Sequence, residues 1–224
     1  MKQRTIGVLV AGALAVVLAI ATLGSAFAQP QPGYGPGGIM GQRGMMGGWG
    51  ARSGQVQALN SLDEAEQAFQ RYIDATGISY LALDEVIQFQ ANYYAIVKDT
   101  STGEGAFELL ANPQTGAVFP EMGPNMMWNT RYGHMAGFGL MGGFVQQPSV
   151  APSVSADQAQ QIAQQWLDQE QPGGTTEAAG TLPGYYTLHI TKDGTITGML
   201  SVNAYTGQVW YHTWHGAFVA STEQ

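Results

Sequence analysis

The sequence predicts an α+β protein made of two similar units, each an N-terminal amphipathic helix packed on a small antiparallel β-sheet. Two observations lead to this fold class. Residues 61–74 and 155–168 are identical at six of fourteen positions without a gap, where about one identity is expected by chance. In both copies, apolar residues first recur every three or four positions and then at every second position, which indicates a helix followed by strands.

The first segment of the chain is typical of an export signal. Lys2 and Arg4 precede an apolar stretch over residues 6–23, and Ala26 and Ala28 supply the small side chains that a signal peptidase requires. We expect cleavage after Ala28, or an uncleaved N-terminal anchor, because the stretch approaches the roughly 20 residues that span a bilayer. Both outcomes predict a secreted or periplasmic protein, tethered to a membrane only through this segment.

Glycine and methionine are concentrated in two windows that are poor in core-forming residues. Residues 29–54 and 122–144 hold 16 of the 31 glycines and eight of the ten methionines, so we expect folding to depend on the rest of the chain. The predicted organisation is a signal peptide or anchor at 1–28, a disordered Gly/Met-rich arm at 29–57, a first unit at 58–121, a Gly/Met-rich linker at 122–152 and a second unit at 153–220.

The charge and the cysteine content narrow the function classes. The sequence has 16 acidic and eight basic residues, with a formal net charge of −8. An acidic chain is a poor partner for a polyanion, so we expect no nucleic-acid partner. No cysteine is present, so packing alone must stabilise domains that are predicted to reach an oxidising compartment.

Each predicted helix carries its own start signal. Ser61 with Glu64, and Ser155 with Gln158, have the spacing of a capping box, in which the hydroxyl accepts a hydrogen bond from the first turn and the later side chain bonds back to the cap. Gly77 is placed to end the first helix in the left-handed conformation. One apolar stripe per helix predicts burial of one face. The stripes are Leu62, Ala65, Phe69, Tyr72 and Ile73 in the first helix and Ala156, Ala159, Ile162, Ala163, Trp166 and Leu167 in the second.

The strands after each helix are predicted to be half-buried and antiparallel, three or four in each unit. Turn-forming pairs that end in glycine separate them, at 102–103, 115–116, 193–194 and 206–207. One helix laid across one face of such a sheet hides the apolar surfaces of both. The alternating apolar residues are Tyr94, Ile96, Phe107, Leu109 and Ala111 in the first unit and Tyr186, Leu188, Ile190, Ile196, Leu200 and Val202 in the second.

These patterns together resemble a known family. The helix, an aromatic pair at 93–94 or 185–186, and a closing hairpin of the type Asn-x-x-Thr-Gly-x-Val at 112–118 or 203–209 are similar to the PepSY domain. The family usually has aspartate where Asn112 and Asn203 stand. The resemblance implies a non-catalytic envelope module that binds or restrains a partner, often a peptidase, and it brings no catalytic residues.

The histidines do not form a recognisable catalytic motif. The sequence has no His-Glu-x-x-His, no Gly-x-Ser-x-Gly and no phosphate-binding loop. His189 shares the strand phase of Tyr185 and Thr187, so we expect it to face water. His212 and His215 point to opposite faces of a strand and are not expected to bind one ion unless the chain turns at residue 214.

The methionines suggest a metal site of another kind. Thioether sulfur is a soft ligand that suits Cu(I), and the candidate ligands in the linker are Met126, Met127, His134 and Met135. The alternative is that the methionines form an adaptable contact surface for a protein.

Aromatic residues follow both closing hairpins. We expect Trp128 after the first hairpin, and Trp210 and Trp214 after the second, to pack between the two units together with Phe119. A unit of about 65 residues without disulfides is marginally stable alone, which favours two units that fold as a pair.

The expected function is that of a non-catalytic secreted or envelope module that binds or regulates a protein partner. The expectation includes no enzyme activity and no cofactor. Two alternatives remain: a Met/His-rich periplasmic copper-binding protein, and a hydrolase whose site the sequence does not reveal.

Overall fold

The computed structural model describes residues 57–133 and 151–222. The predicted signal segment, all but the last residue of the predicted arm, and most of the predicted linker lie outside these ranges. No helix in the described part of the chain is long and apolar enough to cross a membrane. The described chain contains α1 (Leu62–Thr76), β1 (Leu81–Phe89), β2 (Tyr93–Asp99), β3 (Glu104–Ala111), β4 (Val118–Pro120), α2 (Pro124–Met127), α3 (Ala156–Glu170), β5 (Thr175–Leu182), β6 (Tyr185–Lys192), β7 (Thr195–Asn203), β8 (Val209–Tyr211) and β9 (Phe218–Ser221).

The two long helices begin where the sequence predicts. Ser155 and Gln158 form the complete capping box at the start of α3. At α1 the Ser61 hydroxyl accepts from the Glu64 N–H at 3.2 Å, but the Glu64 carboxylate accepts from the N–H of Asn60 instead of Ser61. Both arrangements satisfy N–H groups that the helix itself leaves free.

The strands form two antiparallel sheets, which confirms the α+β class. The first sheet has the order β4-β3-β2-β1-β9 and the second has the order β5-β6-β7-β8. The strand β9 was not predicted. All but its last residue lies within the range assigned to the second unit, yet it pairs with β1 through Ile87–Ser221, Gln88–Ala220 and Phe89–Phe218. The end of the chain therefore completes the first sheet.

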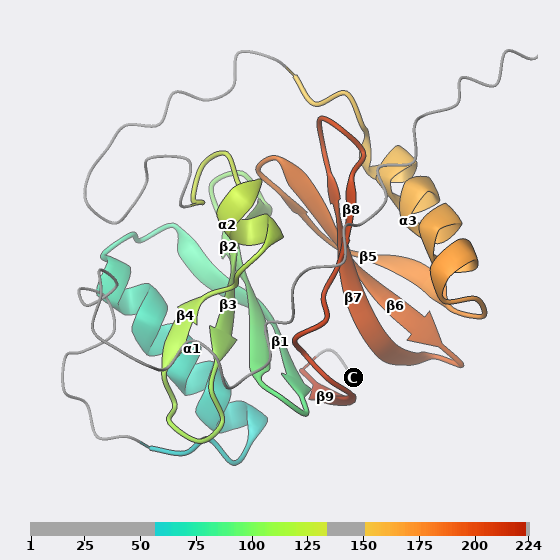
Figure 1. Cartoon of the computed structure of the whole chain (residues 1–224). Helices are drawn as coiled ribbons and strands as arrows, with labels where there is room; N and C mark the ends of the chain where they lie inside the picture. The colour runs from blue at the N-terminus through green and yellow to red at the C-terminus, as the bar shows by residue number, and fades with distance from the viewer. Residues whose placement is uncertain (1–56, 134–150, 223–224) are drawn as a thin grey trace, which may run out of the picture.

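The elements stack in four layers, with α1 and α3 outside and the two sheets between them (Figure 1). Each helix covers the outer face of its own sheet, and the inner faces meet. Strand β2 is therefore buried on both faces, not half-buried as expected. The apolar core between the sheets contains Ile87, Phe89, Tyr94, Ile96, Leu110 and Met199.

The closing hairpins of the two sheets are built in the same way. The side-chain oxygens of Asn112 and Asn203 each accept from the N–H groups two and three residues later, at 2.9 and 3.0 Å in both hairpins. Gly116 and Gly207 follow in the left-handed region, with φ of 65° and 70°, where a side chain would be strained.

These hairpins fix which residues are equivalent. Glu121 donates its N–H to the Glu108 carbonyl at 2.9 Å, and His212 donates its N–H to the Met199 carbonyl at 3.0 Å. Glu121 and His212 are therefore equivalent positions, each nine residues after the hairpin asparagine.

The strand register corrects one detail of the sequence alignment. Tyr93 pairs with Ala111 and Tyr186 pairs with Val202, the residues directly before the two hairpin asparagines. Tyr93 is thus equivalent to Tyr186, although the sequence alignment matches it with Tyr185. Both Tyr93 and Tyr186 pack toward the helix of their own sheet.

A buried carboxylate fastens the end of the first sheet to the segment after α2. Asp99 accepts hydrogen bonds from the hydroxyls of Ser101 and Tyr132 and pairs with Arg131 at 2.9 Å. Burial acts to raise the pKa of Asp99, but the hydrogen bonds from Ser101 and Tyr132, followed by the charge of Arg131, lower it below its usual value.

Candidate functional site

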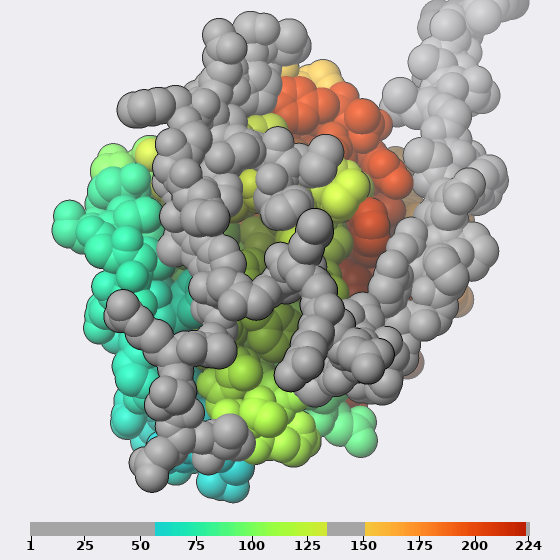
Figure 2. Space-filling model, turned by 60° about the vertical axis from the view of Figure 1, so that its left-hand side comes forward, coloured from blue at the N-terminus to red at the C-terminus, as the bar shows by residue number. Residues whose placement is uncertain are grey.

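Polar side chains from both sheets meet where the inner faces approach each other. Glu108 and Glu121 come from the first sheet, and Ser201, His212 and His215 come from the second sheet and the segment after it; all are buried. In the space-filling view, the β4–α2 region adjoins the C-terminal part of the chain (Figure 2). Buried polar groups need partners, so these contacts define the site.

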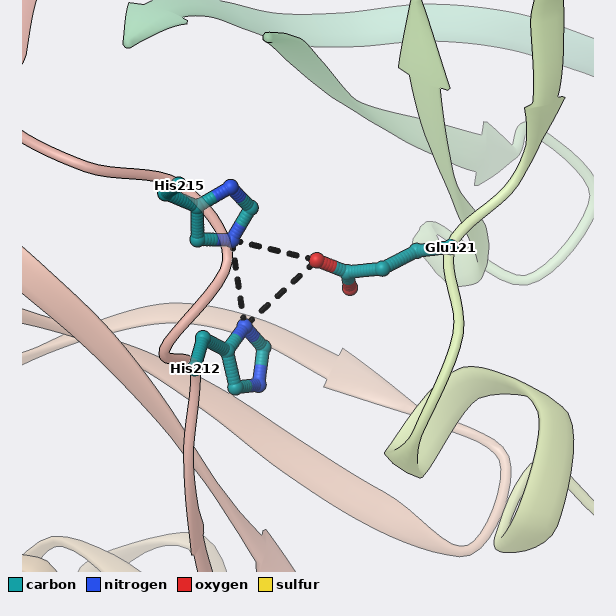
Figure 3. A group of neighbouring side chains, drawn as sticks. All are labelled: Glu121, His212 and His215. Carbon is teal, nitrogen blue, oxygen red and sulfur yellow. Dashed lines mark hydrogen bonds and ion pairs between the residues drawn. The ribbon is translucent and has the colours of Figure 1, made fainter. Parts of the chain in front are cut away.

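Three of these side chains converge on one point (Figure 3). Oε1 of Glu121 lies 3.1 Å from Nε2 of His215 and 3.5 Å from Nδ1 of His212, and the two ring nitrogens are 3.3 Å apart. The side chains are 0%, 1% and 3% exposed for Glu121, His215 and His212. Glu121 follows β4 and the histidines follow β8, so the cluster joins the two sheets.

The outer nitrogens of both rings are held by other side chains. Nδ1 of His215 lies 3.0 Å from Oδ1 of Asn92, whose amide nitrogen donates to the Trp214 carbonyl at 2.9 Å. Nε2 of His212 lies 3.0 Å from the Ser201 hydroxyl. Each ring therefore presents one particular nitrogen to Glu121.

The indole of Trp214 closes one side of the cluster. Its N–H donates to Oε1 of Glu121 at 3.0 Å, and its ring stacks on His212 with centroids 4.7 Å apart. Among the described residues, no N–H or hydroxyl donates to the second carboxylate oxygen, Oε2 of Glu121. That oxygen is buried without a conventional donor, which is uncommon in folded proteins.

Glu108 lies beside this cluster and receives hydrogen bonds from both sheets. The Tyr94 hydroxyl donates to Oε1 at 2.6 Å from within the first sheet, and the Tyr185 hydroxyl donates to Oε2 at 2.6 Å from the second. Burial, followed by the negative charge of Glu121, raises the pKa of Glu108 well above its usual range. The shift has the opposite direction to that of Glu121.

The electrostatics of the cluster favour an ionised Glu121. Burial acts to raise the pKa of Glu121, but the charge and hydrogen bonds of His212 and His215 lower it far below its usual value. Burial lowers the pKa of His215, and its contacts with Glu121 offset part of that shift. One ionised carboxylate thus faces two histidine nitrogens in a place without water access.

A second buried pair lies in the same interface and corrects the expectation for His189. This residue is 8% exposed instead of facing water, and its Nε2 lies 3.3 Å from Oε2 of Glu85 on β1. The strand phase of His189 was predicted correctly, but the face that it shares with Tyr185 and Thr187 is covered by the first sheet.

Two of the four copper-ligand candidates from the sequence lie in the described part of the chain. Met126 and Met127 lie on α2; Met126 is half-buried and Met127 is 56% exposed. His134 and Met135 lie outside the described residues. Neither Met126 nor Met127 is part of the cluster around Glu121.

The sequence predicted that His212 and His215 could meet only if the chain turned at residue 214, and the structure has this turn. His212 and His215 lie after β8, and the chain turns between them, so their rings meet. The sequence reasoning missed Glu121 entirely. A signal was available, because Glu121 and His212 occupy equivalent positions after the two closing hairpins, and equivalent positions meet when two copies pair about a two-fold axis.

The aromatic residues behave largely as predicted. The rings of Trp128 and Trp210 lie edge to face with centroids 5.6 Å apart, and Trp128 also contacts Tyr185 at 6.5 Å. Trp214 packs in the core between the sheets. Phe119 does not fill the interface as expected, since it is 38% exposed.

No family model matches the chain, and no curated protein matches it. Among solved structures, the chain is similar to the C-terminal domain of YpeB from Bacillus megaterium, with 15% identity and a TM-score of 0.35, over 71% of this chain and 69% of that chain.

Proposed function

We propose that this chain is a non-catalytic binding or regulatory module of the cell envelope, in which two PepSY-like units act as one body. The main support for this proposal is the position of the ionisable side chains of the interface. The ionisable side chains of the interface are enclosed between the sheets, where they hold the units together and do not meet a substrate. A catalytic group must reach its substrate.

The surface pockets agree with this proposal. Two surface pockets of the described residues lie beside the end of α1 and share Ile78 and Leu81 as lining residues. Neither contains Glu121, His212 or His215. In this proposal, the partner binds to the exposed surface and the buried cluster stabilises the pairing of the two units.

The proposal includes export and a protein partner in the envelope, such as a peptidase that the module restrains. Mass spectrometry of the exported protein is expected to give Gln29 as the first residue. Intact Met1 in the membrane fraction would instead establish an N-terminal anchor.

The test of the non-catalytic role uses the mature chain. It is expected not to hydrolyse generic peptide or ester substrates, and to lower the activity of an envelope peptidase at stoichiometric ratios. Turnover that disappears in Glu121→Gln or His189→Gln, with the melting temperature unchanged, would identify an enzyme and overturn the proposal.

Copper binding through thioethers is the second candidate. Met122 and Met127 are 40% and 56% exposed, and an exposed methionine is available as a soft ligand. The site would use Met126, Met127, His134 and Met135. Equilibrium dialysis with Cu(I) under reducing conditions tests it, and retention of Cu(I) by a variant with all three methionines changed to leucine would exclude this ligand set.

A further inference from the structure

The three atoms at the centre of the interface have the spacing of ligands around one metal ion. Glu121 Oε1, His212 Nδ1 and His215 Nε2 form a triangle with sides of 3.1, 3.3 and 3.5 Å. Tetrahedral Zn²⁺ binds such atoms at about 2.0–2.1 Å, which places neighbouring ligands about 3.3 Å apart. The three distances in the triangle thus match the spacing of ligands around such an ion.

The hydrogen-bond network fixes which atom of His215 carries hydrogen. The Asn92 amide nitrogen must face the Trp214 carbonyl, because an amide oxygen there would meet another acceptor. Oδ1 of Asn92 therefore faces His215, and Nδ1 of that ring is the donor at 3.0 Å. In the neutral ring, Nε2 then directs a lone pair at Glu121, so the 3.1 Å contact needs either a proton on Nε2 or a cation between the two atoms.

Hydrogen bonds orient the three side chains of the triangle in the way that is common in metal sites. Histidines that bind metals commonly donate their other ring N–H to an oxygen, which sets the orientation and tautomer of the ring. His215 donates in this way to Oδ1 of Asn92, and the Ser201 hydroxyl has the equivalent place beside Nε2 of His212. Trp214 donates to the ligand oxygen of Glu121, which holds the carboxylate in position.

The buried charges of the interface also call for a cation. Glu121 is fully buried with one oxygen lacking a donor, and no Lys or Arg side chain is buried in the part of the chain that the structure describes. A buried carboxylate needs a charged partner or a proton. A divalent ion would supply positive charge where no lysine or arginine does.

We propose that Glu121, His212 and His215 bind a divalent transition-metal ion of the Zn²⁺ class between the two sheets. Two nitrogen ligands and one carboxylate oxygen suit Zn²⁺, and this set contains none of the methionines of the copper hypothesis. The ion ties the segment after β4 to the segment between β8 and β9. It therefore fastens the units to each other and holds the chain that leads to β9.

The experiment is a titration of the mature, chelator-treated chain with Zn²⁺, followed by calorimetry and by the melting temperature. We expect one equivalent to bind and the melting temperature to rise by about 5–10 °C at a free Zn²⁺ concentration of 100 times Kd. Two variants remove a ligand with little other change. Glu121→Gln keeps the size of the side chain, and His215→Asn keeps a polar atom facing Asn92 while it removes Nε2.

The matched control is His189→Gln, which alters a buried histidine of the same interface outside the triangle. We expect the control to keep the one-equivalent binding and both ligand variants to lose at least a hundredfold in affinity. Co²⁺ provides a readout on the unmodified chain if a variant fails to fold, because tetrahedral nitrogen and oxygen coordination gives intense visible absorption. Absence of Zn²⁺ binding by the unmodified chain, or equal binding in Glu121→Gln and His215→Asn, would overturn the proposal.

Discussion

Replacing Tyr185 with Phe removes a hydroxyl that joins the two sheets, with Glu108 as its nearer acceptor and Oδ1 of Asn125 as a second at 3.3 Å. The Tyr185 hydroxyl, on β6, donates to Oε2 of Glu108, on β3, at 2.6 Å, and both side chains are buried. A typical hydrogen bond contributes about 0.5–1.5 kcal/mol, and a buried group left without its partner costs about 1–3 kcal/mol. We therefore expect Tyr185→Phe to lower the free energy of unfolding by about 1–3 kcal/mol.

Two further variants separate the interface from general effects of the substitution. Tyr94→Phe removes the matching donor to Oε1 of Glu108 within one sheet, at 2.6 Å, and is expected to cost a similar amount. Tyr186→Phe removes a bond to the Val154 carbonyl at a half-buried position, where water can replace the hydroxyl, so it should cost about 1 kcal/mol or less.

The assay is urea unfolding of the three variants and the unmodified chain, followed by circular dichroism. The loss in Tyr185→Phe should lower the melting temperature by about 3–10 °C for a protein of this size. If Tyr185→Phe were as stable as the unmodified chain while Tyr94→Phe was destabilised, the Tyr185 hydroxyl would be in water and the two sheets would not meet as described.

Two other predictions address the interface and the first sheet. At Gly184, where φ is 98°, an added methyl group would overlap the Trp128 carbonyl, whereas one on Gly194 would meet nothing. Thermal unfolding should show that Gly184→Ala lowers the free energy of unfolding by more than about 2 kcal/mol and Gly194→Ala by about 1 kcal/mol. Equal losses in the two variants would contradict the contact. Because the pKa of Asp99 is lowered on folding, its stabilisation is present above about pH 4, the unfolded value, and is lost as the pH falls through the folded value. Asp99→Asn should therefore cost about 1–3 kcal/mol in urea unfolding at pH 7 and less at pH 3, and a gap that widens in acid would refute this sign.

The features that the sequence predicted correctly are local ones. The Ser155–Gln158 cap and the two hairpin asparagines act within a few residues of themselves, so their residue types and spacing specify the structure. The helical stripes are equally local, because a period of 3.6 residues places them on one face.

The site could not be predicted in the same way because it depends on how the two sheets meet. The strand phase of His189 was right, yet its exposure was wrong, since the phase does not say whether a face is covered. The pairing of β9 with β1 joins residues more than 120 positions apart, and no local pattern marks it. Glu121 becomes a candidate when its equivalence with His212, nine residues after the hairpin asparagine in each copy, is combined with the pairing of the two sheets.

The central claim is that the two units unfold as one body, because their inner faces share a core and a buried polar cluster. Differential scanning calorimetry of the mature chain tests it directly. With about 150 described residues and about 0.7 kcal/mol per residue near 60 °C, we predict one transition of about 100 kcal/mol whose calorimetric and van't Hoff enthalpies agree. Two separate transitions of about half that enthalpy each would show independent units and contradict the account.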